Sequence, residues 1–547
     1  MSDMIFETNP DEYKHWKLEI SPPLARLSMD VQLSGEDDDA DYQRKLNSYD
    51  IHVDVELADA VNRLRFEHPE VKVVIVGSHR DRIFCAGANI FMLAGSTHPF
   101  KVNFCKFTNE TRLGIEDASA FSGQKYIAAV NGTASGGGYE LALACDEILL
   151  IDDRSSAVSF PEVPLLAVLP GTGGLTRVVD KRRVRRDLAD VFSTTAEGVK
   201  GRRAVEWGLV DAVHPKSRFE DAVEERAQEL ASAGPDKSGA GVTLTPLNST
   251  IDESEIRYRH VTMKVDSDAR TAEIVVSGPE DGGPDNPASI RELGSDWWPL
   301  RMFRELDDAL LRLRFNHASS GLVLLKTRGE AAHVLAHDAA LAAHHADDWF
   351  VSEVLHHAKR VLKRLDLTAR TFYALADEES CFAGSLLELA LAADRTYMLD
   401  SPDDPVALHV GPLSAGMLPM ANGISRLETR FLDDSERVAA VLASTGPIDP
   451  PTAEKLGLVT FAPDDLDWDD ELRLAIEERV CMSPDALTGM EASLRFAGPE
   501  TLETKIFGRL SAWQNWIFQR PNAVGDHGAL SLYGKPERAQ FDWRRTG

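Results

Sequence analysis

Hydrophobic and polar positions follow two alternating periods along the chain. Short apolar runs, such as VKVVIV at 71–76 and KYIAAV at 125–130, have the composition of buried β-strands. Between such runs lie segments with apolar residues at helical spacing, such as RFEDAVEERAQELASA at 218–233. Repeated strand–helix units are typical of α/β proteins, so we predict an α/β fold.

A glycine-rich segment, NGTASGGGYELALACDE at 131–147, directly follows the run KYIAAV. After its three consecutive glycines, apolar residues recur at helical spacing from Leu141 to Ile148. A strand, a glycine turn and a helix leave backbone N–H groups unpaired at the helix start, and glycine lets a ligand approach them. Glu140, one turn into the predicted helix, can place a carboxylate in the same space.

A second glycine loop, IFCAGANIFML at 83–93, follows the other apolar run and also precedes a helical pattern. Its Ala-Gly-Ala turn presents backbone N–H groups near Ala88. Two such loops can direct two donors at one oxygen and form an oxyanion hole. Removing one donor from such a hole costs about 10²–10³ in rate.

The sequence also repeats itself at a nearly constant shift. RLRFEHPEVKVVIV at 63–76 returns as RLRFNHASSGLVLL at 312–325, and ELALACDEILLID at 140–152 returns as ELALAADRTYMLD at 388–400. Repetition at a fixed interval indicates two copies of one fold. We predict an N-terminal catalytic domain at 1–234, a linker at 235–257, a degenerate second copy at 258–465 and a mainly helical region at 466–547.

Charge and cysteine content narrow the possible partners. The chain of 547 residues has a net charge of −29, which argues against a nucleic-acid partner. The acidic N-terminal segment lacks an apolar core and the longest apolar runs contain acids, so we expect neither a secretory signal nor a membrane partner. Five scattered cysteines fit reduced thiols, and we expect a cytoplasmic protein.

The order and spacing of F-x-A-G-A-N-I-F-M-L, N-G-x-A-x-G-G-G-x-E-L-A-L-A-C-D and S-F-P-E-x(7)-P-G-T-G-G-x-T-R resemble the enoyl-CoA hydratase (crotonase) superfamily. The resemblance implies a fold of repeated ββα turns, here present twice in tandem, and an acyl-coenzyme A substrate. It implies that the N–H groups of Ala88 and Gly137 hold the thioester oxygen. It also implies that Glu140 and Glu162 are the catalytic carboxylates.

Two glutamates suit addition of water beside a thioester, because one group must accept a proton while another donates one. In a pocket lined by Phe84, Leu165 and Leu166, we expect the two carboxyl groups to have different pKa values. The alternative for Glu140 is an acid that complements the helix dipole, and for Glu162 a turn residue after a proline.

The resemblance also implies further substrate contacts. It places Asn89 where the family usually has aspartate, and a basic residue for the coenzyme A phosphates at Arg44 or Lys45 in QRKLNSYD. The other substrate-binding positions predicted in the two loops are Ala86, Gly87, Ile90 and Gly136.

Cys105 is a further catalytic candidate, on the helical stretch KVNFCKFTNETRL that follows the first glycine loop. Lys106 beside it could lower the pKa of the thiol, although a buried structural cysteine is a more common outcome. His333 and His337 are four residues apart, but without accompanying ligands we expect no metal site.

The doubled length and motif set look like those of ring-cleaving superfamily members in aerobic benzoate degradation. That resemblance implies hydrolysis of 2,3-epoxybenzoyl-CoA or its dihydrodiol to 3,4-dehydroadipyl-CoA semialdehyde and formate. No cofactor is expected, because the thioester itself accepts electrons and coenzyme A is part of the substrate. We expect a homodimer.

Two other functions remain open from the sequence. One is an enoyl-CoA hydratase or isomerase that acts on another bulky acyl-CoA, and the other is a non-catalytic acyl-CoA-binding or assembly protein. The second copy has Ser385 and Leu386 in place of two glycines and lacks an Ala-Gly-Ala loop, although Glu388 is retained. We therefore expect the second copy to be a scaffold.

Overall fold

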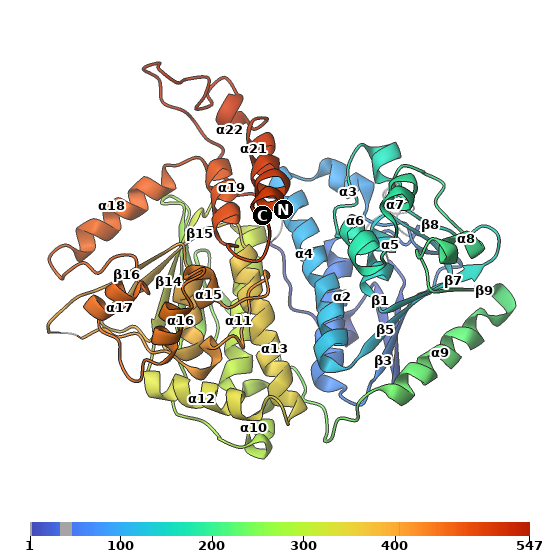
Figure 1. Ribbon diagram of the computed structural model, residues 1–547, viewed down its shortest axis with the longest axis horizontal. Helices are drawn as coiled ribbons and strands as arrows, with labels where there is room; N and C mark the ends of the chain where they lie inside the picture. The colour runs from blue at the N-terminus through green and yellow to red at the C-terminus, as the bar shows by residue number, and fades with distance from the viewer. Residues whose placement is uncertain (1–2, 33–45, 404) are drawn as a thin grey trace. The chain divides into compact units, whose positions relative to one another are not determined.

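The computed structural model describes residues 3–32, 46–403 and 405–547, and strands alternate with helices in it as the sequence predicts (Figure 1). The chain divides between Leu244 and Thr245 into two units, with the residues up to Phe6 belonging to the second unit. This division falls within the segment 235–257 that the sequence marks as a linker. We describe each unit separately.

The first unit is built on a six-stranded sheet in the order β1-β2-β3-β5-β7-β9. β1 and β2 form an antiparallel hairpin, and the other neighbours are parallel. Buried side chains of the sheet pack against Phe219 and Val223 of the helix predicted at 218–233. The strands are β1 (Trp16–Ser21), β2 (Leu24–Met29), β3 (Val73–Ser78), β5 (Lys125–Val130), β7 (Glu147–Asp152) and β9 (Ala212–Pro215).

A second, three-stranded sheet determines where the two glycine loops lie. Its parallel strands are β4 (Arg82–Cys85), β6 (Gly132–Ser135) and β8 (Val158–Ser159), in the order β4-β6-β8. Each glycine loop follows one of these strands and leads into a helix, α3 (Ile90–Gly95) after β4 and α5 (Gly137–Ala144) after β6. Because β4 and β6 are paired and parallel, the two loops emerge side by side.

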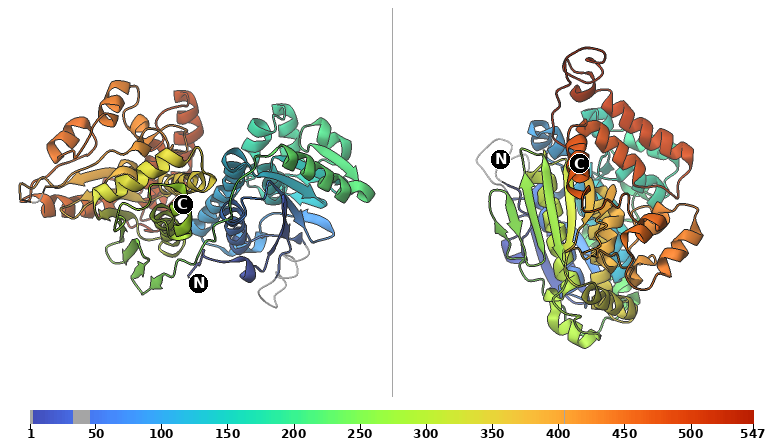
Figure 2. Two further views of the ribbon diagram at one scale, coloured as in Figure 1. Left: turned by 90° about the horizontal axis from the view of Figure 1, so that it is seen from below. Right: turned by 90° about the vertical axis from the view of Figure 1, so that its left-hand side faces the viewer.

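Helices cover the sheets of the first unit (Figures 1 and 2). The helical pattern from Leu141 to Ile148 is broken earlier than predicted, because the chain becomes extended at Cys145 and Ile148 lies in β7. The remaining helices are α2 (Ile51–Glu67), α4 (His98–Asp117), α6 (Gly174–Thr176), α7 (Arg186–Ser193), α8 (Gly201–Glu206) and α9 (Phe219–Ala233).

The chain after α9 packs against the first unit before the division. The amide of Val242 donates to the carbonyl of Phe66 at 2.7 Å, and the amide of Leu244 donates to the Glu67 carboxylate at 2.8 Å. Both side chains are buried. This part of the glycine- and serine-rich segment is therefore fixed by burial and backbone pairing, which its composition does not reveal.

The second unit has a seven-stranded sheet in the order β10-β11-β12-β13-β14-β15-β16. Strands β10 to β13 are antiparallel and strands β13 to β16 are parallel, so an antiparallel hairpin again leads into a parallel series. The strands are β10 (Thr250–Ile251), β11 (Glu255–Arg257), β12 (Val261–Asp266), β13 (Thr271–Ser277), β14 (Leu322–Arg328), β15 (Thr371–Ala376) and β16 (Arg395–Met398).

The connection after β14 differs from its counterpart in the first unit. β3 is followed by β4 and the Ala-Gly-Ala loop, whereas β14 leads into α12. The helices of this part are α10 (Pro287–Leu293), α11 (Trp298–Asn316), α12 (Ala331–His344), α13 (Trp349–Leu367), α14 (Leu387–Ala392), α15 (Arg426–Arg430), α16 (Ser435–Leu442) and α17 (Pro450–Leu456).

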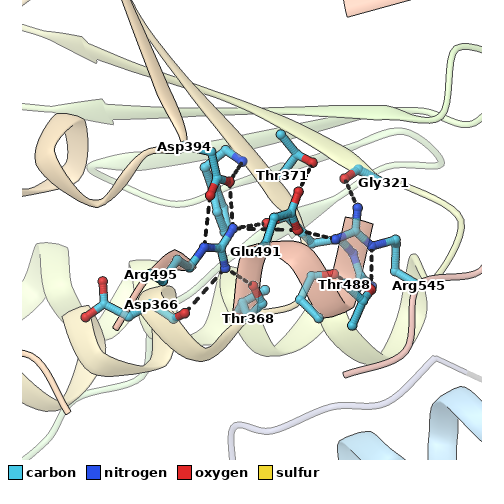
Figure 3. Close-up of polar contacts among 12 residues, drawn as sticks. Gly321, Asp366, Thr368, Thr371, Asp394, Thr488, Glu491, Arg495 and Arg545 are labelled. Atoms are coloured by element: carbon cyan, nitrogen blue, oxygen red, sulfur yellow. Dashed lines mark hydrogen bonds and ion pairs between the residues drawn. The ribbon is translucent and has the colours of Figure 1, made fainter. Parts of the chain in front are cut away.

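The C-terminal region belongs to the second unit, and a buried polar network around Glu491 and Arg545 joins it to the sheet (Figure 3). The Glu491 carboxylate accepts hydrogen bonds from Thr371 of β15 and from Arg545. Arg545 also donates to Thr488 at 3.1 Å and to the carbonyl of Gly321 at 3.3 Å, which ties the last residues to the sheet. The helices are α18 (Trp468–Val480), α19 (Pro484–Leu494), α20 (Leu502–Lys505), α21 (Ser511–Ile517) and α22 (Pro521–Val524).

Candidate active site

Two main-chain amides lie at the adjoining ends of β4 and β6. Gly137 is the first residue of α5, and Ala88 lies two residues before Ile90, where α3 begins. Among the described residues, neither amide donates a hydrogen bond to a protein acceptor. A Cβ added to Gly87 would lie 2.9 Å from the Gly137 nitrogen, so the two loops are in direct contact. These are the two donors that the sequence predicts for an oxyanion hole.

Glu140 is buried in the first turn of α5, with its carboxylate held by the loop that precedes α6. The amides of Thr172 and Gly174 donate to Glu140 Oε1 at 2.9 and 2.8 Å. The Thr172 hydroxyl donates to the other carboxylate oxygen. Three donors therefore compensate the charge of Glu140 and fix its orientation.

Glu162 is also buried, but its carboxyl group lacks comparable donors. Oε1 is 2.6 Å from the position that a Cβ of Gly136 would occupy, and Oε2 has no hydrogen-bond partner among the described residues. Burial, with a smaller contribution from the charge of Glu140, raises the pKa of Glu162 to about 7. Glu162 can therefore exchange a proton near neutral pH.

The surroundings of Glu162 differ from the apolar pocket predicted from the sequence. Phe84 is buried in β4, but Leu165 and Leu166 are 66% and 40% exposed. The residues from 163 to 169, which follow Glu162, are exposed, and Ala167 among them has a positive φ of 53°. The main chain at Gly136, which lies against Glu162 Oε1, contributes to the burial of the carboxyl group instead.

Cys105 lies on α4 beside the loop that holds Glu140. Its Sγ atom is 3.9 Å from the position of a Cβ on Gly171. Asn109 links the same elements by donating to the carbonyls of Cys105 and Gly171 at 3.0 and 3.1 Å. Burial, with the charge of Glu140, raises the pKa of the thiol to about 11. The suggestion that Lys106 lowers this pKa is therefore wrong.

The other predicted contacts have distinct local roles. Asn89 caps α3, because its side chain accepts hydrogen bonds from the amides of Phe91 and Met92. Ile90 begins α3 and is partly exposed, and the amide of Ala86 donates to the carbonyl of Leu46 at 3.0 Å. Arg44 and Lys45, predicted to bind the coenzyme A phosphates, lie outside the described residues.

Two buried residues near the amides, Tyr49 and Arg112, are not indicated by any pattern in the sequence. Arg112 Nη2 donates to the Tyr49 hydroxyl and to the carbonyl of Gly137, both at 3.1 Å. Arg112 comes from α4 and Tyr49 from the turn before α2, so no short motif joins them. Thr172 was detectable, since it lies in the PGTGG segment, but the sequence does not show which side chain its loop binds.

The corresponding part of the second unit is closed by its own side chains. Gly384 has a φ of 51°, close to the 54° of Gly136, but the amide of Ser385 donates to Asp338 Oδ2 at 2.5 Å. The retained Glu388 accepts a hydrogen bond from Arg426 at 3.1 Å, and Arg426 also pairs with Asp366. The side chains of Asp338, Glu388, Arg426 and Asp366 are all buried. Because of these hydrogen bonds, both the Ser385 amide and the Glu388 carboxylate already have protein partners.

The described residues contain neither a cluster of metal ligands nor a helix that could cross a membrane. Within residues 3–32, 46–403 and 405–547, no cluster of three or more histidine, cysteine or acidic side chains has a geometry suited to a metal ion. In the same ranges, no helix combines the length and the apolar character that a bilayer span requires.

Comparison with known proteins supplies the family. A family model for enoyl-CoA hydratase/isomerase matches residues 41–275. The chain is 54% identical over 543 residues to benzoyl-CoA-dihydrodiol lyase from Aromatoleum evansii, covering 99% of this chain and 98% of the relative. A carnitinyl-CoA dehydratase from Proteus mirabilis (strain HI4320) is 29% identical over 191 residues, which cover 35% of this chain and 69% of the relative.

Among solved structures, an enoyl-CoA hydratase from Geobacillus kaustophilus HTA426 shares 33% identity, with a TM-score of 0.36, over 40% of this chain and 75% of the other. The relative from Aromatoleum evansii matches almost from end to end, which extends the similarity beyond the residues matched by the family model. The chain therefore belongs to the enoyl-CoA hydratase/isomerase family and, within it, groups with benzoyl-CoA-dihydrodiol lyase.

Proposed function

We propose that this protein is a carbon–carbon lyase that hydrolytically opens the ring of 2,3-epoxybenzoyl-CoA or the corresponding dihydrodiol. From the epoxide, two molecules of water are consumed, and the products are 3,4-dehydroadipyl-CoA semialdehyde and formate. The similarity to benzoyl-CoA-dihydrodiol lyase over nearly the full length supports this class of reaction. Its place would be in the aerobic degradation of benzoate through coenzyme A esters.

The observation that carries the proposal is the combination of two unpaired amides with two carboxyl groups in different environments. The N–H groups of Ala88 and Gly137 would hold the thioester oxygen and stabilise the enolate that forms during ring opening. Glu140, already oriented by Thr172, would accept a proton from water. Glu162, with a pKa of about 7, would donate a proton to the departing oxygen.

Cys105 would supply a further proton transfer. Its raised pKa keeps the thiol protonated near neutral pH, which suits a hydrogen-bond or proton donor and disfavours attack by a thiolate. The loop at Gly171, which carries the donors to Glu140, lies beside the sulfur atom. In this arrangement, a change at Cys105 would also affect the orientation of Glu140, the proposed base.

The remaining features of the proposal concern the whole chain. The thioester would serve as the electron sink, so the mechanism requires neither a metal nor a redox cofactor. The second unit would be a degenerate copy of the first and act as a scaffold. This interpretation is supported by its similar strand order and by its occupied amide at Ser385. We also propose a cytoplasmic homodimer with an acyl-CoA as its small-molecule partner.

The decisive experiment is to incubate the purified full-length protein with 2,3-epoxybenzoyl-CoA and to measure formate and the semialdehyde product. Equal amounts of both products would support the proposal. Glu140→Gln, which keeps the size of the side chain, is the matched control and should lower turnover at least about 100-fold. Hydration of crotonyl-CoA without release of formate from the epoxide would instead support a hydratase. Binding of acyl-CoA without turnover of either substrate would support a non-catalytic role.

A further inference from the structure

We propose that Tyr49 and Arg112 are positioning residues that hold the two amides of the oxyanion hole at a fixed separation and orientation. The inference rests on the proposed function, because it concerns the support of the amides of Ala88 and Gly137. Neither residue needs to touch the substrate. Together they link the two glycine loops, which come from different ββα turns.

The main chain of Tyr49 fixes the first amide. Its N–H group donates to the carbonyl oxygen of Gly87 at 3.0 Å, and its own carbonyl accepts from the amide of Asn89 at 2.8 Å. The Ser48 hydroxyl donates to the same Gly87 oxygen at 2.8 Å. Since a trans peptide is planar, holding the carbonyl of Gly87 also sets the opposite direction in which the Ala88 N–H points.

The side chain of Tyr49 reaches the second amide. A Cβ on Gly137 would collide with the Tyr49 hydroxyl, so the phenol lies directly against this residue. Arg112 Nη2 donates to both the Tyr49 hydroxyl and the carbonyl of Gly137. On the other side of Gly137, the carbonyl of Gly136 accepts from the amide of Glu140 at 3.0 Å. The peptide that bears the Gly137 N–H is thus held through the carbonyl of Gly136, and Arg112 holds the following peptide through the carbonyl of Gly137.

Arg112 is itself held in a buried position. Its Nη1 donates to the carbonyl of Thr108 at 3.1 Å and lies 3.5 Å from Asp54 Oδ1, and the other oxygen of Asp54 accepts from the Thr108 hydroxyl. Both charged side chains are almost fully buried. Burial of such a pair is weak evidence for stabilisation, because removing two charges from water is costly. A role in orienting the amides would explain its presence here.

The charge of Arg112 also suits the chemistry of the site. The guanidinium lies at the N-terminal end of α5, where the helix dipole is already positive. An enolate oxygen bound to the Gly137 N–H would therefore form near positive groups that are already in position, with part of the charge of Arg112 balanced by Asp54. Preorganised donors of this kind are effective because they are in position before the charge develops.

The test measures polarisation of a bound carbonyl, which a merely structural role would not change. Benzoyl-CoA labelled with ¹³C at the thioester carbonyl would be bound to the full-length protein, and its carbonyl stretch would be recorded by difference infrared spectroscopy. Binding to the unmodified protein should lower the stretching frequency. Tyr49→Phe and Arg112→Met should both reduce that shift. Tyr49→Phe should lower kcat about tenfold and Arg112→Met about 100-fold, while the Kd for benzoyl-CoA stays within threefold of the unmodified protein's value. Arg112→Lys should retain more of the carbonyl shift and more of kcat than Arg112→Met.

Tyr139→Phe is the matched control, because Tyr139 is a buried tyrosine of α5, the helix that begins at Gly137, and its hydroxyl donates to the carbonyl of Leu209 at 2.7 Å. It should leave the carbonyl shift and kcat unchanged. A full carbonyl shift and full kcat in Tyr49→Phe would overturn the positioning role, and this isosteric variant keeps the test valid if Arg112→Met does not fold. No carbonyl shift in the unmodified protein would instead overturn the oxyanion hole and, with it, this inference.

Discussion

The carboxyl group of Glu162 lies against the main chain of Gly136, with Oε1 2.6 Å from the point that a Cβ on Gly136 would occupy. Any side chain at position 136 would therefore meet the carboxyl group, and the φ of 54° at Gly136 also favours glycine. The same glycine precedes the amide of Gly137. One residue thus brings the proton-exchanging acid and the oxyanion donor together.

The first prediction concerns the pH dependence of turnover. Because Glu162 has a pKa of about 7 and is proposed to donate a proton, kcat/KM should fall as the pH rises through about 7. Steady-state rates between pH 5.5 and 9 would measure this limb. In Glu162→Gln the limb should disappear and turnover should fall at least about 100-fold. A variant that retains both the limb and the rate would exclude Glu162 as the donor.

The second prediction concerns the cost of ionising Glu162 in the folded protein. Its pKa of about 7, compared with 4.5 for an ordinary glutamate, means that the folded state binds this proton more tightly than the unfolded state. Its contribution to stability is therefore complete below pH 4.5 and is lost as the pH rises to about 7, by at most about 3 kcal/mol. Glu162→Gln should consequently raise the free energy of unfolding at pH 8 more than at pH 5, as measured by urea denaturation. An equal increase in the free energy of unfolding at pH 5 and at pH 8 would contradict the raised pKa of Glu162.

The third prediction tests how Glu140 is oriented. Thr172→Val removes the hydroxyl donor to Glu140 but keeps the shape of the side chain and the amide donor. Turnover should fall about tenfold, by analogy with the loss of one hydrogen bond to a charged group. Thr194→Val is a suitable control, because Thr194 is exposed and its hydroxyl donates only to carbonyls of its own helix turn. Similar rates for the two variants would remove Thr172 from the mechanism.

The local parts of the site were predictable from the sequence, and the long-range parts were not. Glycine loops and strand–helix alternation indicate unpaired amides near Ala88 and in the triple-glycine turn, because the peptide geometry at a helix start is set by neighbours in sequence. The resemblance to the crotonase superfamily then implies that Ala88 and Gly137 are the pair. The support from Arg112 depends on how α4 packs beneath α5. No periodicity or spacing along the chain specifies that contact.

The environment of Glu162 shows the same limit. Leu165 and Leu166 are apolar and close in sequence, which favours a covered pocket, yet both are exposed in the first unit. Burial of Glu162 involves the close approach of Gly136, a residue from another ββα turn. For Cys105, the neighbouring Lys106 suggested a route to a lowered thiol pKa, whereas burial, the alternative considered, raises it.

The fourth prediction addresses Cys105. If the protonated thiol acts as a donor, Cys105→Ser should keep at least about one tenth of the activity, and Cys105→Ala should lose clearly more. The thiol should react slowly with iodoacetamide at pH 7.5, because its pKa of about 11 leaves little thiolate. Full activity in Cys105→Ala would assign the residue a structural role. Rapid alkylation at this cysteine, located by mass spectrometry, would contradict the raised pKa.

The fifth prediction separates the two units by function. Glu388 is the counterpart of Glu140 in the repeated sequence, but its carboxylate is paired with Arg426 in a buried cluster. Glu388→Gln should therefore leave kcat unchanged and lower the free energy of unfolding of the second unit by about 3 kcal/mol, as expected when one partner of a buried ion pair is removed. Glu140→Gln is the matched variant, and in contrast to Glu388→Gln it should lower turnover at least about 100-fold. Loss of turnover in folded Glu388→Gln would show that the second unit takes part in catalysis, because destabilisation alone cannot slow the fraction of molecules that remains folded.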